Sequence, residues 1–313
     1  MPPSPPPDTA SVLAQSFEVD TPCRIQIDMP GVHTRLRPAK AEERIHVRLD
    51  VAEGASAQAD QILDRLDIST QQKKGTVRVF SGADRTDAAW WRWLRTRSAA
   101  LHLDVQLPTP TEANVLVPGG SLDAADLNGT FHFEAMGSPV QVRNLHGQLT
   151  VLAESSDVEI TDCEGESVSA TVAAGQLTVG DTQADTITLR SASAPLTARR
   201  LSGTLDVQVN GGAATLDTIR GACTARAEGA PLDYTGCPSD DTTLTVVGTT
   251  LSTALPPDCG LTLTMEGPDL SLDEALRFEG ERAPEIIEGT LAGGGPSLSL
   301  RAPQGRIECR SAG

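Results

Sequence analysis

From residue 127 onward, apolar residues recur in pairs at positions i and i+2, and successive pairs lie nine residues apart. Divided from Leu127, the chain forms lines of 18 or 19 residues. Five of the first six lines open with a small or apolar corner residue, any residue, and then glycine. Alternation with a period of two is typical of half-buried β-strands, and the segments between the pairs are rich in turn residues. The pattern predicts two short strands and a tight bend in each line.

The predicted inward residues of the six lines are one set of apolar pairs. They are Phe131/Phe133, Val140/Val142, Leu149/Val151, Val158/Ile160, Val168/Ala170, Leu177/Val179, Ile187/Leu189, Leu196/Ala198, Leu205/Val207, Ala214/Leu216, Cys223/Ala225 and Leu232/Tyr234. The same step recurs at Leu261 to Leu272, at Leu298 to Cys309 and, more weakly, at Ile25 to Leu36. No single line can bury its apolar face alone, whereas stacked lines bury a continuous column.

The repeat therefore predicts an all-β fold: a single-stranded β-solenoid with coils of 18–19 residues. The alternative is an antiparallel sandwich of hairpins. The corner-x-glycine motif favours the solenoid, because it occurs once per line rather than at alternate turns. One short α-helix is expected near the N-terminal end at 57–66, AQADQILDRL, where Ala59, Ile62, Leu63 and Leu66 share a helical face and could cover an exposed end.

Composition shifts define the expected domain organisation. Residues 1–16, with five prolines in the first seven positions, predict a disordered tail. Residues 17–313 form one solenoid domain, with an irregular part at 17–120, regular repeats at 121–275 and a closing segment at 276–313. The period breaks at DEALRFEGERAPEIIEG, which is interpreted as an excursion before the last two strands.

The segment LDVQLPTPTEANVLVPGGSLDAADLNGTFHFEAMGSPVQVRNLHGQLTVLAESSDVEITDCEG and the closing GGGPSLSLRAPQGRIECR resemble a known family. The family is the bacterial putative-adhesin family, a β-strand-repeat domain of unknown function similar to adhesin head (GIN) domains. The resemblance runs from about residue 17 to the end. It implies a right-handed β-solenoid without an established enzyme activity, and family members are often exported or membrane-attached.

Charge and local composition narrow the expected partners and location. A net charge of −17 opposes binding to nucleic acid and to anionic lipid. The N-terminus lacks a basic region followed by an apolar core, and no run of about 18 apolar residues occurs. The sequence as written is therefore expected to be cytoplasmic, with peripheral membrane attachment left open.

Chemistry-bearing residues are scattered rather than clustered. The histidines His33, His46, His102, His132 and His146 accompany no nucleophile elbow, and there is no phosphate-binding glycine loop. We expect no catalytic residue, cofactor or metal. The six cysteines lack zinc spacing and are expected to be free, packing as small hydrophobes.

The outward strand positions carry mainly threonine, serine and isolated acids. No two acids stack on adjacent lines of one face, as a glycosidase pair would require. The acidic stretch 155–166 could bind Ca²⁺ weakly, although a solvated acidic face is the simpler interpretation. The threonine-rich face is explained by β-propensity, with contact to carbohydrate or protein as the alternative.

All three tryptophans lie in AWWRWLRTRS, residues 89–98. They could be a structural plug over a solenoid end, in which a strand would place Trp91 and Trp93 on one face. Together with arginines they could instead anchor a membrane or protein surface. Base stacking with nucleic acid is disfavoured by the acidic surroundings. The candidate contact residues are Trp90, Trp91, Arg92, Trp93, Arg95 and Arg97.

These observations favour a non-enzymatic scaffold or binding module, adhesin-like by resemblance. Two alternatives remain: a carbohydrate-active β-solenoid enzyme, or a polymer-forming protein similar to bactofilins. The interruption between residues 38 and 120 argues against end-to-end polymerisation.

Overall fold

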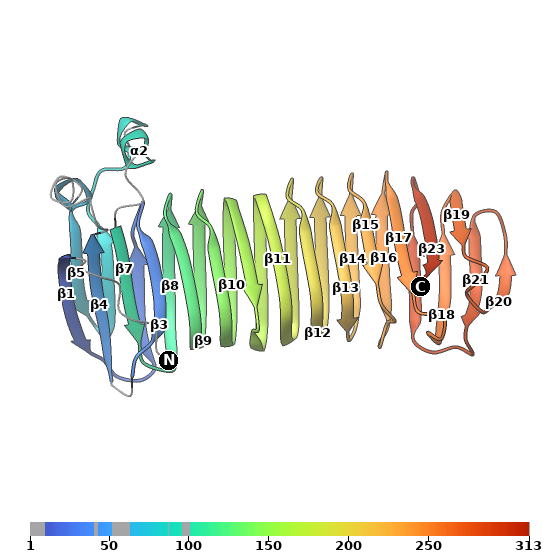
Figure 1. Ribbon diagram of the computed structural model, residues 1–313, viewed down its shortest axis with the longest axis horizontal. Coiled ribbons are helices and arrows are strands. Elements are labelled where there is room, and N and C mark those ends of the chain that lie inside the picture. Colours follow the sequence, from blue (N-terminus) through green and yellow to red (C-terminus); the bar gives the residue numbers. More distant parts are fainter. Residues whose placement is uncertain (1–9, 41–42, 52–62, 87, 96–100, 313) are drawn as a thin grey trace. The chain divides into compact units, whose positions relative to one another are not determined.

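The protein is all-β, with α2 as its one complete helix in the described part of the computed structural model. The structure describes residues 10–40, 43–51, 63–86, 88–95 and 101–312. The chain divides into two compact units, residues 1–157 and 158–313. Figure 1 shows strands running side by side in both.

Unit 1 contains ten strands, the last of which continues into unit 2. They are β1 (Ala10–Glu18), β2 (Cys23–Asp28), β3 (His33–Pro38), β4 (Arg44–Val51), β5 (Ile68–Lys73), β6 (Thr76–Ser81), β7 (Leu101–Leu107), β8 (Thr111–Pro118), β9 (Ser121–Met136) and β10 (Val140–Thr161), with α2 (Ala88–Arg95) between β6 and β7. Strand β1 includes residues 10–16, which the sequence assigns to a disordered tail. Residues 76–118, expected to be irregular, supply β6, β7 and β8.

Unit 2 contains the regular repeats and the closing segment. Its strands are β11 (Glu164–Ala192), β12 (Leu196–Asn210), β13 (Ala214–Arg220), β14 (Cys223–Glu228), β15 (Leu232–Thr235), β16 (Thr242–Val247), β17 (Thr250–Leu255), β18 (Leu261–Glu266), β19 (Asp269–Leu272), β20 (Phe278–Arg282), β21 (Ile286–Leu291), β22 (Ser297–Arg301) and β23 (Arg306–Ser311).

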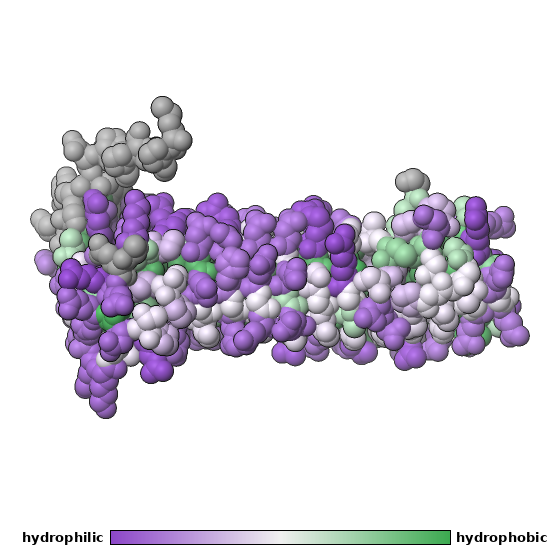
Figure 2. All heavy atoms as spheres, turned by 90° about the horizontal axis from the view of Figure 1, so that it is seen from below, coloured by the Kyte–Doolittle hydropathy of each residue, from purple (hydrophilic) through white to green (hydrophobic). Residues whose placement is uncertain are grey.

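Parallel pairing joins neighbouring repeats, where a repeat means two successive strands and their turns. Val140 pairs with Leu122, Leu196 with Leu177, and Leu232 with Ala214. Parallel pairing excludes the antiparallel sandwich for these strands. All the inward pairs predicted from Phe131 to Tyr234 are buried. Outward side chains alternate with them, and the face in Figure 2 is mainly hydrophilic.

The corner glycines permit close backbone stacking. Gly147 and Gly203 have φ values of 121° and 134°, and a Cβ at either position would collide with a carbonyl oxygen of the preceding repeat, that of Gly129 or Ala184. Only glycine tolerates both constraints. The repeat that carries Ala184 instead has an irregular register between Gln183 and Thr186. An irregular register thus accompanies the missing glycine.

A second recurring backbone feature precedes each corner. Residues with φ near +50° to +60° occur at equivalent places in successive repeats: Asp126 and Asn144 in unit 1, and Asp162, Asp181, Arg200 and Thr218 in unit 2. Aspartate and asparagine tolerate this left-handed conformation better than most residues. Their side chains link neighbouring repeats, since Asn144 donates to Asp126 at 2.7 Å and Arg200 donates to Asp181 at 2.5 Å.

The first repeat of the chain is not the outermost repeat of unit 1. Strand β2 pairs with both β6 and β8, and β3 pairs with both β7 and β9, all in parallel. The repeat β2–β3 is therefore held between two later repeats. The outer repeat of unit 1 is β6–β7. Antiparallel strands cover it, because β5 pairs with β6, and β4 pairs with β7 and with β1.

The last repeat of unit 2 is enclosed in the same way. Strand β22 pairs with β16 and β18, and β23 pairs with β17 and β19. Figure 1 shows the C-terminal strand in this inserted position. The segment interpreted as an excursion forms the antiparallel hairpin β20–β21, which covers β18. Sequence order and spatial order thus differ at both ends of the chain.

Candidate functional site

The tryptophan segment is helical rather than extended. Helix α2 begins at Ala88 and ends at Arg95, between β6 and β7. Figure 1 shows it beyond the ends of the unit 1 strands. Trp90 and Leu94 are separated by one helical turn, and Trp91 lies beside them on the same side, so the helix has an apolar face. The strand geometry considered from sequence is incorrect, because residues 88–95 are helical and Trp91 and Trp93, two positions apart, do not share a face of a helix.

Side-chain contacts of Leu94, Arg85 and Trp91 attach this helix to the rest of unit 1. The Leu94 side chain is buried and lies against Gly31, where any added Cβ would overlap it. Arg85, just before the helix, pairs with Asp28 at 2.6 Å and also donates to the Ser81 carbonyl at 3.1 Å. Trp91 Nε1 donates to the Arg85 carbonyl at 2.8 Å. These bonds fix the start of α2 relative to β2 and β6.

The tryptophans form one cluster whose members are each half-buried. The Trp90 and Trp91 rings meet edge to face with centroids 4.9 Å apart, and Trp93 lies 6.4 Å from Trp90. The guanidinium of Arg65 lies 4.8 Å from the Trp93 ring centre, within cation–π range. The cluster therefore combines apolar area with a cation.

The sequence predicts that three arginines, Arg92, Arg95 and Arg97, act with the tryptophans. Arg92 is exposed on α2. Arg95 is the last residue of the helix, and its side chain is outside the described set. Arg97 also lies outside the described residues, as does most of the helix predicted at 57–66. Residues 63–66 of that prediction are helical, and Leu66 is buried.

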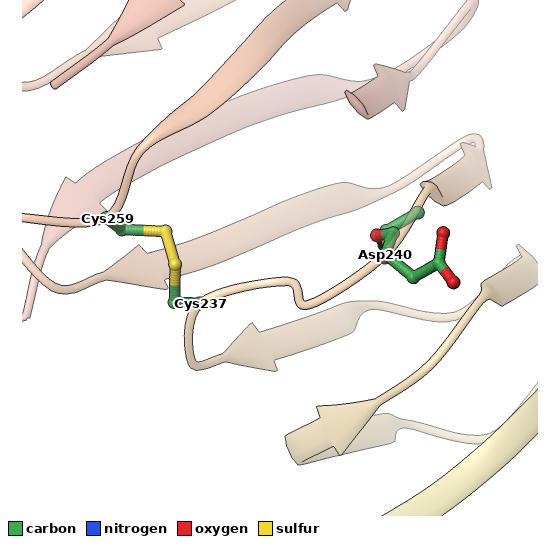
Figure 3. The surroundings of a disulfide bond; sticks show 4 residues. Cys237, Asp240 and Cys259 are labelled. Atoms are coloured by element: carbon green, nitrogen blue, oxygen red, sulfur yellow. Dashed lines mark hydrogen bonds between the residues drawn. A yellow bond between two sulfur atoms is a disulfide. The ribbon is translucent and has the colours of Figure 1, made fainter. Parts of the chain in front are cut away.

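The cysteines depart from the sequence expectation at two positions. Cys237 and Cys259 form a disulfide with a Cα–Cα distance of 5.6 Å (Figure 3). It joins the corner after β15 to the segment that leads into β18, and the expectation of free thiols is wrong for this pair. Irregular spacing in sequence did not signal it, because the two corners become neighbours only after the repeats stack.

The other cysteines are buried and not disulfide-bonded, as predicted: Cys23, Cys163, Cys223 and Cys309. Burial raises the pKa of Cys223 to about 12 and that of Cys309 to about 11. A thiol with so high a pKa is a poor nucleophile at neutral pH. These side chains therefore fill core space.

The outward acids are separated from one another by hydroxyl residues. Asp206 is registered between Thr188 and Thr224, and Asp233 lies between Thr215 and Ser252. Paired carboxylates for glycoside hydrolysis are not assembled on these two rows. Among the described residues, no group of three or more His, Cys, Asp and Glu side chains is arranged to hold a metal ion.

Comparison with known protein families identifies the family of this chain. The model of the toastrack family, DUF4097, matches residues 23–228. The chain belongs to the toastrack DUF4097 family. This agrees with the resemblance to putative adhesins drawn from the sequence. The match includes the first repeat and the tryptophan helix and ends in β14.

Solved structures similar to this toastrack chain are described as adhesion proteins. A putative adhesin from Parabacteroides merdae has 10% identity and a TM-score of 0.40, with 96% of each chain covered. A putative adhesin from Bacteroides fragilis has 8% identity and a TM-score of 0.28, also with 96% coverage of each. A putative cell adhesion protein from Clostridium sporogenes has 8% identity and a TM-score of 0.22, covering 96% of this chain and 99% of the other. No curated protein matches.

The described residues include no helix with the length and apolar character needed to span a bilayer.

Proposed function

We propose that this toastrack chain is a non-enzymatic binding module: a β-solenoid with coils of 18–19 residues that presents helix α2 to a protein partner. The parallel pairings of residues 18 or 19 positions apart, such as Val140 with Leu122 and Leu196 with Leu177, support the solenoid. Parallel stacking of equivalent repeats is the pattern expected of such a fold.

The observation that carries the binding role is the tryptophan cluster on α2. Three half-buried indoles and the exposed Arg92 lie on a helix that Leu94 and Arg85 hold in place. Tryptophan and arginine are the residue types enriched in interface hot spots. A protein partner is favoured over an anionic bilayer, because the net charge of −17 repels the bilayer and the indoles pack on one another instead of splaying outward.

A site-specific photo-crosslinker in place of Arg92 tests this role in native cells. The matched control carries the crosslinker in place of Arg200, an exposed arginine of unit 2. We expect a discrete protein adduct from position 92 only. Lipid adducts at position 92, or the same adducts from both positions, would contradict a protein partner.

The strand faces support a non-enzymatic role over a carbohydrate-active enzyme, since outward acids are interspersed with threonine and serine. Incubating the purified chain with a panel of acidic polysaccharides tests the non-enzymatic role, and any turnover of a polysaccharide would contradict it. Polymerisation is opposed by the antiparallel strands that cover β6 and β7 in unit 1 and β18 in unit 2. The edge strand β20 exposes Glu279, Glu281 and Arg282, which discourage strand addition.

The disulfide supports a location for unit 2 in an oxidising compartment, in place of the cytoplasmic location expected from sequence. Disulfides persist in such compartments and are rare in the reducing cytoplasm. Alkylating native cells with a thiol reagent before lysis, followed by mass spectrometry, distinguishes the two locations. Modified Cys237 would argue for the reducing compartment, because this residue is exposed on the surface.

A further inference from the structure

A polar hollow of about 430 Å³ lies on the outer face of β4, β7 and β3 in unit 1. Pairing places its side chains in two rows. Arg48, Asp104 and Arg35 form one row, and His46, Gln106 and Arg37 form the next. We call this hollow the arginine groove. Its volume lies within the range of small-molecule sites.

Two arginines of the groove retain unused hydrogen-bond donors. Arg48 donates through Nε to Asp50 Oδ1 at 2.8 Å, which leaves its two terminal nitrogens for other partners. Arg35 lies 3.4 Å from Asp104 and 3.9 Å from Asp123, both long for a charge-assisted bond. The Arg35 and Arg48 side chains are 56% and 53% exposed, so a ligand could reach them.

Asp123 holds Arg37 and Arg143 in position beside the groove. Asp123 accepts bonds from Arg37 and, at 3.2 Å, from Arg143. Although its partial burial opposes this, the bonds and charges of these two arginines hold the pKa of Asp123 below its usual range. Its carboxylate is therefore committed to the arginines next to the groove.

The charges around the groove do not balance. Four arginines (Arg35, Arg37, Arg48 and Arg143) surround three acids (Asp50, Asp104 and Asp123). On a protein with a net charge of −17, this local excess of positive charge marks the groove as a place for an anion. Guanidinium groups match carboxylate and sulfate oxygens in two-point geometry.

Neutral polar groups complete the lining. Gln15, Ser16 and Gln106 line the same hollow as the arginines, and His46 Nδ1 lies 2.8 Å from Ser16 Oγ. Amide and hydroxyl groups of this kind exchange hydrogen bonds with sugar hydroxyls. We propose that the arginine groove binds an acidic saccharide, with the sugar's carboxylate or sulfate at Arg35 and Arg48 and its hydroxyls along the glutamines.

Calorimetric titration of the full chain tests this with three oligosaccharides of equal length: one carboxylated, one sulfated and one neutral. We expect a charged sugar to bind and the neutral sugar to bind at least about tenfold more weakly, because charge-assisted bonds are the larger contribution. The stronger of the two charged ligands identifies the oxyanion.

Variants that are expected to change the affinity in opposite directions separate effects on binding from effects on stability. Arg35→Gln and Arg48→Gln should each weaken binding about tenfold. Asp104→Asn should strengthen it, because it removes the acid that competes for Arg35; a purely structural role for Asp104 would not do so. Arg200→Gln removes the same charge from an exposed ion pair in unit 2 and should leave binding unchanged.

Several results would overturn the proposal. These are equal binding of neutral and charged sugars, an equal loss in the Arg200→Gln control, or an acidic peptide that binds when no saccharide does. Weaker binding by Asp104→Asn in a folded protein would also overturn it. Variants of Trp93 should retain saccharide binding, so the outcome is independent of the role proposed for α2.

Discussion

At both ends of the chain, the terminal repeat is inserted between two other repeats. The outer repeat is fully covered by antiparallel strands in unit 1 but only partly covered in unit 2. In unit 1 the first repeat, β2–β3, pairs on both sides with later repeats. In unit 2 the last repeat, β22–β23, also pairs on both sides. Terminal strands usually fray because they have few neighbours. Inserting them between other repeats gives each one two hydrogen-bonded neighbours.

The outer repeats differ. In unit 1, β6 is covered by β5, and β7 is covered by β4. In unit 2, β18 is covered by β21, whereas β19 has β23 as its one partner among the described strands. Leu270 and Leu272 of β19 are accordingly only half-buried, while Leu103 and Val105 of β7 are fully buried. Burial of the predicted inward positions thus depends on a partner strand, not on the pattern alone.

The largest effect is expected from deleting residues 297–313. This removes Leu298, Leu300 and Ile307, all fully buried, each worth about 1.5–3 kcal/mol. Their combined loss is comparable with the typical stability of a domain, about 5–15 kcal/mol. Hydrogen exchange should show lost protection in β16 to β19. Replacing the hairpin 274–290 with a short linker is the control: it removes the β21 partner of β18 but should preserve protection in β16 and β17. Equal losses in β16 and β17 in both variants would contradict the inserted-repeat interpretation.

Single substitutions sharpen the difference between inserted and outer repeats. Ile25→Ala and Leu298→Ala should each lower the free energy of unfolding by about 3 kcal/mol, as in a closed core. Leu270→Ala removes the same group from a half-buried site, and about 1 kcal/mol is expected. Urea unfolding measures all three. A similar loss at Leu270 would mean that β19 is covered in solution.

The inserted repeats explain where sequence reasoning succeeded and failed. Period-two alternation identified the inward residues from Phe131 to Tyr234, because each strand needs only to show which face is apolar. It could not identify which repeat pairs with which. Every repeat offers a similar apolar face, so the neighbour of β22 is decided by contacts far apart in sequence. The pattern therefore contains no information on the pairing order of the repeats.

The candidate sites were also only partly visible in the sequence. The clustering of tryptophan and arginine identified the α2 segment, but its helical form depends on tertiary contacts such as Leu94 on Gly31. The arginine groove gave no sequence signal, because Arg35, Arg48 and Asp104 come from three separate strands. Their proximity follows from pairing registers that a local pattern does not contain.

Removing the disulfide should weaken the C-terminal end specifically. The bond encloses a loop with a sequence separation of 22 and restricts the unfolded chain, so a loss of about 2–3 kcal/mol is expected. Cys237→Ala with Cys259→Ala should increase hydrogen exchange in β18 and β19 while leaving β2 and β3 protected. The variant Cys223→Ala, at a buried free thiol, is the control for lost side-chain volume. Uniform changes across both units would contradict a local role.

The smallest effect concerns two aspartates that anchor the inserted C-terminal repeat. Asp241 accepts bonds from the Ser297 backbone and hydroxyl at 3.0 and 2.7 Å. Asp273 accepts from the backbone of Ala275 and Ser311 at 2.9 and 3.1 Å. These bonds hold the pKa of both carboxyl groups below the ordinary value of 3.8.

A depressed folded pKa fixes the sign of the pH dependence. Stabilisation is present above the unfolded value of 3.8 and is lost as the pH falls through the lower folded value. Exchange of the Ser311 amide should therefore rise in acid before exchange in β2 and β3 does. Asp273→Asn should raise it slightly at neutral pH and remove most of this acid dependence, because the amide does not titrate. An unchanged acid response in Asp273→Asn would assign the loosening to other groups.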